Sequence, residues 1–193
     1  VKMMVGRDVN ELFPKQEAEI GEPVLSVRGL TSPGVFSDIS FDVRAGEIVA
    51  LAGLVGAGRS EVARAVFGVD GYTEGSVQIS GKAVHPSDPS AAMAQGLALV
   101  PEDRRKQGLV IDAPVRTNLT DAIRRHLVRC GLMTNSRENS SAREWARRLE
   151  VKTASLDSVA GTLSGGNQQE VVLAKWLATD PKVLIIDEPT RGI

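Results

Sequence analysis

The sequence predicts an α/β fold, with strands paired in parallel at the core and a smaller helical subdomain inserted between them. Two observations predict it. Uninterrupted apolar runs at residues 48–51 and 183–186 are typical of strands buried on both faces. Each run also lies next to a segment with the apolar spacing of a helix. Strands that alternate with helices favour parallel pairing.

Shorter signals complete the expected core. Four further segments have the apolar content or the alternation of a strand: 24–27, 39–43, 77–79 and 97–100. Helical spacing covers residues 59–67, where Gly68 is a plausible end, and residues 167–178, where Pro181 stops the helix.

The middle of the chain, residues 102–163, has a different character. It is rich in Arg, Ser and Asn, with helical patterning over 118–130 and 141–149, and it predicts the inserted helical subdomain. Its arginines suggest contacts to phosphate or RNA. Acidic residues are interleaved with them, however, which favours a solvated helix face.

Composition excludes several classes of protein. The chain has 193 residues, 42% of them hydrophobic, and a net charge of -1, which argues against a dedicated nucleic-acid binder. No apolar stretch reaches the ~20 residues of a membrane span. The one cysteine, Cys130, cannot form an internal disulfide, as is typical of a reducing compartment. We therefore expect a soluble, cytosolic protein. Because Val1 is not a methionine and Ile193 closely follows an apolar run, we also expect a piece of a longer chain.

The first candidate site is a glycine-rich turn between an apolar run and a helix. Residues 53–60 read Gly-Leu-Val-Gly-Ala-Gly-Arg-Ser and match the phosphate-loop pattern except at the lysine. Glycines let successive amides turn inward around phosphate oxygens, and the helix N-terminus adds partial positive charge. The candidate nucleotide-binding residues are Gly53, Val55, Gly56, Ala57, Gly58, Arg59, Ser60 and Glu61. The alternative is a turn with a packing role only.

Arg59 stands where the pattern has lysine. Its guanidinium still pairs with phosphate oxygens, but it is longer and planar, whereas lysine carries a compact ammonium. We therefore expect this loop to keep nucleotide binding better than hydrolysis.

The second candidate site follows the apolar run 183–186. Asp187 and Glu188 stand at the expected carboxyl end of a buried strand, where open α/β sheets hold ligands. Asp187 would bind Mg²⁺ together with the Ser60 hydroxyl, and Glu188 would accept a proton from an attacking water. The alternative is an acidic turn at a strand end.

The third candidate site is Ser164, Gly165 and Gly166, followed by Asn-Gln-Gln at a helix start. A capping hydroxyl and bare amides form an anion site. Taken alone, this motif would be an ordinary helix cap. Its position, just before the helix that leads into the acidic strand, distinguishes it from such a cap.

The three sites, in this order, resemble the nucleotide-binding domain of the ATP-binding cassette family, in which they look like the phosphate loop, the signature motif and the magnesium strand with its catalytic glutamate. The resemblance covers residues 24–193. It implies a P-loop NTPase-type core with a mostly parallel sheet, an antiparallel β subdomain and an inserted helical subdomain at about 103–165, truncated at the C-terminus. ATP and Mg²⁺ are the implied cofactors.

A finer resemblance concerns the second cassette of tandem ATPases that serve bacterial monosaccharide importers of the ribose, galactose and xylose type. It is carried by Val-Pro-Glu-Asp-Arg-Arg at 100–105, Ser-Gly-Gly-Asn-Gln-Gln and Asp-Glu-Pro-Thr-Arg-Gly-Ile. The opening segment from Val5 to Pro14 is similar to the linker between the two cassettes, which we expect to span residues 1–23. The implied partners are the upstream cassette or a second such domain, membrane permease subunits and, indirectly, a periplasmic sugar-binding protein. The implied location is the cytoplasmic face of the bacterial inner membrane.

One departure concerns Glu102, which occupies the position of the glutamine that links magnesium, attacking water and membrane subunit in this family. The resemblance implies a catalytic role for it, through the metal. The chain also ends before the family's aspartate-containing loop and switch histidine, so we expect the fragment alone to be inactive.

Two other functions stay open. One is a soluble cassette ATPase that acts on ribosomes or DNA, although the sequence has no coiled-coil arm or basic linker. The other is a regulatory nucleotide-binding module without catalysis, which Arg59 favours and Glu188 disfavours.

Overall fold

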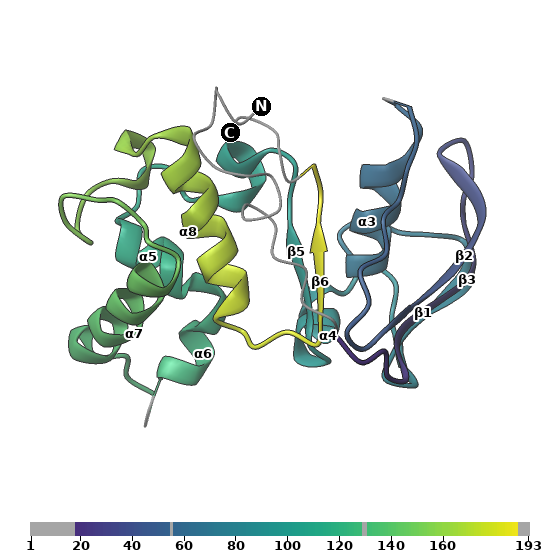
Figure 1. Ribbon diagram of the computed structural model, residues 1–193, viewed down its shortest axis with the longest axis horizontal. Coiled ribbons are helices and arrows are strands. Elements are labelled where there is room, and N and C mark those ends of the chain that lie inside the picture. Colours follow the sequence, from purple (N-terminus) through teal and green to yellow (C-terminus); the bar gives the residue numbers. More distant parts are fainter. Residues whose placement is uncertain (1–17, 55, 129–130, 189–193) are drawn as a thin grey trace.

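The computed structural model describes residues 18–54, 56–128 and 131–188. An antiparallel sheet lies at one end of the molecule, a group of helices at the other, and a short parallel sheet between them (Figure 1). Two hydrophobic clusters meet at the parallel sheet, one shared with the antiparallel sheet and one with the helices. The predicted α/β fold with a separate helical region is confirmed.

The antiparallel sheet has the strand order β2-β1-β3-β4. Its strands are β1 (Pro23–Ser32), β2 (Phe36–Arg44), β3 (Glu74–Ile79) and β4 (Lys82–Val84). Leu25, Val27 and Leu30 of β1 are buried, while β2 alternates between partly buried and exposed residues. The strands expected near 24–27, 39–43 and 77–79 are confirmed.

Helix α3 (Arg59–Phe67) covers one face of this sheet and also contacts β5 (Leu97–Val100). It begins after Gly58 and ends at Gly68, both with positive φ, 83° and 86°. Only glycine adopts this left-handed conformation without strain, so the two glycines fix the ends of the helix.

The parallel sheet pairs β5 with β6 (Val183–Ile186), Leu97 opposite Val183 and Val100 opposite Ile186. Among the described residues, every helix that follows β5 lies in the connection between the two strands. Helix α4 (Pro89–Ala94) precedes β5 and is capped by the Asp88 side chain.

The prediction of a strand at residues 48–51 is wrong. These residues pair with no other strand of the described chain, and Ile48 is 97% exposed. An apolar pattern indicates that a segment favours burial. It does not determine whether a neighbouring strand is present to form the backbone hydrogen bonds that every strand needs. The segment instead lines a cavity together with β6.

The helical region contains η1 (Arg104–Gly108), α5 (Val115–Thr120), η2 (Asp121–Ile123), α6 (Arg124–Leu127), α7 (Asn135–Arg148), η3 (Ala160–Thr162) and α8 (Gly165–Leu177). Helix α8 confirms the expected helix near 167–178, and α7 begins six residues before the expected 141. Among the described residues, every helix is too short or too polar to cross a bilayer.

The single helix expected over 118–130 is wrong in the part that the structure describes. That segment divides into α5, η2 and α6, and Val128 is extended. Leu119 and Ile123 are both buried at a spacing of four, which explains why the pattern suggested one helix. Cys130 lies outside the described residues.

Asn118 holds the loop before α5 in place. Its side chain is buried, accepts from the Val110 amide at 2.8 Å and donates to the carbonyls of Val110 and Pro114 at 3.0 and 3.2 Å. The buried amide group is therefore satisfied at both ends, as burial requires.

We expect Leu119→Ala to lower the free energy of unfolding by about 2–5 kcal/mol, because it leaves a cavity in the cluster shared by α5 and α8. Urea denaturation followed by circular dichroism measures the change. Leu132→Ala is the control, since Leu132 is 72% exposed, and it should change stability by less than about 0.5 kcal/mol. Equal effects of the two substitutions would contradict the assignment of the core.

Candidate functional site

The glycine-rich turn leads directly into α3. Gly56 and Gly58 have φ values of 82° and 83°, and the Ala57 amide donates to the Leu54 carbonyl at 3.0 Å. A Cβ on Gly58 would lie 3.2 Å from the Val35 carbonyl oxygen. A side chain at Gly58 would therefore crowd this carbonyl, whereas Gly56 has open space around it. Val55 lies outside the described residues.

Helix α3 starts without a side-chain cap at Gly58. The amides of its first turn, which belongs to Arg59, Ser60 and Glu61, have no carbonyl one turn earlier in the helix. Such a helix start attracts an anion, because the amides and the helix dipole present partial positive charge. The described end of the predicted cradle is therefore an uncapped helix start, a form suited to an anion.

The predicted carboxylates lie at the carboxyl ends of β5 and β6. Because β5 and β6 run parallel with Val100 opposite Ile186, Glu102, Asp187 and Glu188 all follow the carboxyl ends of neighbouring strands. The Asp187 amide donates to the Val100 carbonyl at 3.0 Å and continues the ladder by one bond. The topology thus gathers the three predicted acidic residues at one edge of the sheet.

Glu188 has a φ of 47°, in the left-handed region that a residue with a side chain adopts at a cost. Residues in this conformation persist where the surrounding structure holds them, and they gather at functional sites. The sequence carries no signal for this feature.

An ion pair joins the two predicted sites across 129 positions of sequence. Arg59 Nη2 lies 3.5 Å from Glu188 Oε1, and the two side chains are 32% and 40% exposed. Arg59, Asp187 and Glu188 line the same cavity of about 530 Å³, together with residues 47–51 and the strand β6. The geometry therefore brings the glycine-rich turn and the acidic strand to one hollow in the surface.

The third predicted site lies elsewhere. Ser164 caps α8, and its hydroxyl oxygen accepts from the backbone and side-chain amides of Asn167. Ser164, Gly165 and Gly166 do not line the cavity of Arg59. Helices α8 and α3 lie on opposite sides of the β5–β6 pair, and both contact β5 (Figure 1). A Cβ on Gly166 would meet nothing within 4 Å, so this helix start is open.

Sequence reasoning missed Lys175. This residue is 8% exposed, and its Nζ donates to the Gly108 carbonyl at 2.5 Å. Burial lowers the pKa of Lys175, and the Asp121 carboxylate partly opposes the shift. The only sign of a special role in the sequence is a lysine among the apolar residues of a predicted helix. That pattern does not identify the Gly108 carbonyl as its partner.

The sequence matches the model of the ABC transporter family over residues 36–191. It is 61% identical to the ribose import ATP-binding protein RbsA 1 of Streptomyces coelicolor and 56% identical to the ribose import ATP-binding protein RbsA of Rhodococcus jostii. Both matches cover 100% of this chain but only 38% of the relative. The chain thus spans about two fifths of the length of these curated relatives.

Solved structures agree on the fold. A dimeric structure of the ATP-binding cassette MJ0796, in a post-hydrolysis state with ADP and Pi, superposes with a TM-score of 0.73 at 20% identity, over 88% of this chain and 75% of that one. A bacterial Atm1-family ABC exporter with ATP bound gives 0.64 at 23% identity, over 94% and 32%. The chain therefore belongs to the ABC transporter family and has the fold of its ATP-binding cassettes.

Proposed function

We propose that this chain is the ATP-binding part of a bacterial ABC importer for ribose or a closely similar simple sugar, and specifically its second cassette. The relatives described above are named as ribose import ATP-binding proteins, and they are 56–61% identical over the whole chain. The observation that carries the ATP-binding role is the meeting of Arg59 and Glu188 on one cavity.

The amides of the turn from Gly53 to Gly58 and of the first turn of α3 would bind the phosphates of ATP. The positive φ values and the uncapped helix start support this assignment. Arg59 would pair with phosphate oxygens. Glu188, at the end of β6, would orient the attacking water and accept its proton.

Ser60 and Asp187 would hold Mg²⁺. A hydroxyl and a carboxylate suit this ion, which keeps several waters and shares phosphate oxygens. Among the described residues, no group of three or more His, Cys, Asp or Glu forms a metal site by itself, and this fits a metal that arrives with its nucleotide. Glu102, which follows β5, would assist hydrolysis by interacting with the ligands or waters around Mg²⁺. When bound, Mg²⁺ neutralises charge on the phosphates.

The site of Arg59 would bind ATP but turn it over slowly. In the structure the guanidinium of Arg59 contacts the carboxylate proposed as the base. A partly exposed pair of this kind contributes about 0–1 kcal/mol, so a triphosphate displaces it readily. The planar fork of arginine still differs from the compact ammonium of lysine near the transferred phosphate.

Ser164, Gly165 and Gly166 would contact ATP that a second cassette holds, either upstream in the same polypeptide or in a partner chain. Their open position, away from the cavity of Arg59, supports this role. In this proposal residues 1–23 link the cassettes, residues 24–193 form the cassette, and about 103–165 form its helical subdomain.

The whole protein would act at the cytoplasmic face of the inner membrane with permease subunits and, indirectly, a periplasmic sugar-binding protein. It would bind no nucleic acid. A regulatory module without catalysis is the second candidate function, because the contact of Arg59 with Glu188 favours binding over turnover.

Arg59→Lys in the full-length protein, assembled with its membrane subunits in vesicles, should raise ATP turnover several-fold. The compact ammonium of lysine cannot contact the Glu188 carboxylate and a phosphate oxygen at the same time, as the guanidinium of arginine can. Adding Glu188→Gln should remove that gain. A phosphate-release assay measures both. Arg64→Lys is the matched control, since Arg64 lies on the same helix in a similarly exposed ion pair with Asp70. Unchanged turnover in Arg59→Lys would favour the regulatory module.

Gly166→Ala should leave folding intact and reduce ATP turnover by about tenfold or more, a loss of at least ~1.4 kcal/mol of transition-state stabilisation. The added methyl group has free space in the isolated chain and favours the helix, but it occupies the surface proposed to meet phosphate.

Thermal melting and ATPase activity are measured together. Ser136→Ala, in the first turn of α7, is the control and should change neither. A Gly166→Ala protein with normal turnover would contradict the proposed contact.

A further inference from the structure

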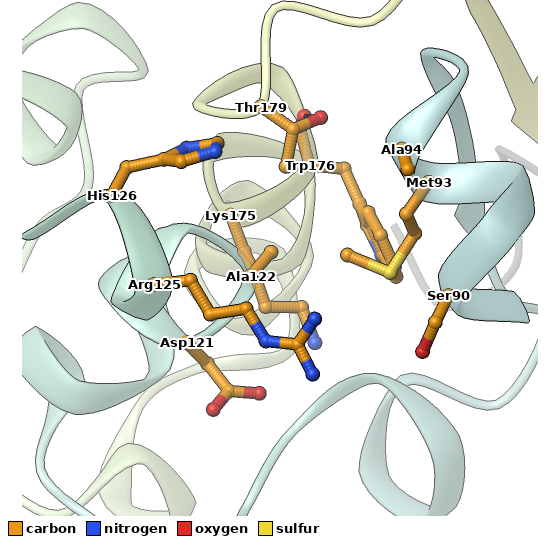
Figure 2. A pocket seen from close by; sticks show the side chains of 10 residues that line it. All are labelled: Ser90, Met93, Ala94, Asp121, Ala122, Arg125, His126, Lys175, Trp176 and Thr179. Atoms are coloured by element: carbon orange, nitrogen blue, oxygen red, sulfur yellow. Dashed lines mark hydrogen bonds between the residues drawn. The ribbon is translucent and has the colours of Figure 1, made fainter.

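Helix α8 is joined to the segment after β5 by a buried lysine. Lys175 Nζ donates to the Gly108 carbonyl at 2.5 Å, and the ammonium lies 5.3 Å from the centroid of the Trp176 ring. Figure 2 shows Lys175 on α8 together with Asp121 and Arg125, which line the same cavity of about 380 Å³. An ammonium buried in this way needs strong partners, and the Gly108 carbonyl is one.

A second contact strengthens the same joint. A Cβ on Gly108 would lie 2.9 Å from Cγ2 of Val172, which stands three residues before Lys175 on α8. Gly108 is buried, so its backbone lies directly against the helix. One polar and one apolar contact, on the same helix face, thus fix the end of η1 on α8.

The segment between Glu102 and Gly108 is internally bonded. The Asp103 side chain accepts from the amides of Arg105 and Lys106 at 3.1 Å each, and the Asp103 carbonyl accepts from the Gln107 amide at 2.9 Å. These bonds make a compact turn of residues 103–107, and Gly108 at its end lies against α8.

We propose that Lys175 is a positioning residue that fixes the Glu102 segment on α8, so that Glu102 and the Ser164–Gly166 end of α8 move as one rigid unit. This inference rests on the proposed function, in which the two ends contact two different ATP molecules. Displacement of α8 by one nucleotide then changes the position of Glu102 at the other.

Stability alone does not account for a lysine at this place. Burial of an ammonium is costly, and the pKa of Lys175 is lowered accordingly. A methionine of similar length would fill the same space without that cost. The lysine does add a directed bond to Gly108, which an apolar side chain lacks.

The test uses the full-length protein with its membrane subunits in vesicles and measures ATP turnover against ATP concentration. Lys175→Met should lower kcat about tenfold and change KM for ATP by less than about twofold, because the joint acts in turnover rather than in binding. Lys175→Arg retains donors and should restore most of kcat. Lys82→Met is the control, since Lys82 is exposed on β4, and it should match the wild type.

Thermal melting separates positioning from folding. Lys175→Met removes the cost of a buried ammonium but leaves the Gly108 carbonyl without this donor, so the two effects on stability oppose each other. We expect a melting temperature within a few degrees of the wild type while kcat falls.

A pair of compensating substitutions at Gly108 and Val172 tests the contact between η1 and α8 while Lys175 stays unchanged. Gly108→Ala should push η1 away from α8 and lower kcat as Lys175→Met does, because the new methyl group meets Val172. Adding Val172→Ala makes room for that methyl group and should recover at least half of the loss.

The outcomes separate the two claims. Normal turnover in the wild type and an unchanged kcat in both Lys175→Met and Gly108→Ala would overturn the positioning role and leave the proposed function standing. A wild-type assembly that hydrolyses no ATP would overturn the proposed function, and the positioning role with it.

Discussion

The parallel pairing of β5 with β6 is the constraint on which the rest of the molecule depends. Its register sets Val100 opposite Ile186 and therefore brings Glu102, Asp187 and Glu188 to one edge. The two hydrophobic clusters also meet at these strands, with α3 on one side and α8 on the other. If the register shifted by one residue, every buried side chain of β6 would turn to the opposite face. Asp187 and Glu188 would then leave the cavity of Arg59.

Much of the fold could be predicted from the sequence, because local patterns encode it. The alternation at residues 39–43, the glycines on either side of α3 and the four apolar residues before Asp187 all predicted elements that the structure contains. The segment at 48–51 shows the limit of such reasoning. Apolar character indicates that a segment favours burial, but the strand beside it comes from distant sequence. Residues 118–130 were predicted as one helix for the same reason, since buried residues at a spacing of four do not reveal where α5, η2 and α6 begin and end.

The candidate site was partly predictable as well. Gly58, Arg59 and the pair Asp187 and Glu188 belong to motifs whose residue types follow from the chemistry of phosphate and magnesium. That Arg59 lies against Glu188 could not be predicted, since the contact joins residues 129 positions apart. Lys175 was missed because its partner is a backbone carbonyl, and a carbonyl leaves no trace in the amino-acid sequence. Close approaches such as that of Gly108 to Val172 are equally invisible until the chain is folded.

The left-handed backbone of Glu188 has a consequence for the stability of this protein. Holding a residue other than glycine in that conformation costs about 1–3 kcal/mol, which the surrounding core must supply. Glycine at this position would relieve the cost and give a more durable molecule, but one without the carboxylate. If Glu188 acts as we propose, its backbone conformation and its chemistry make opposite demands on the same position.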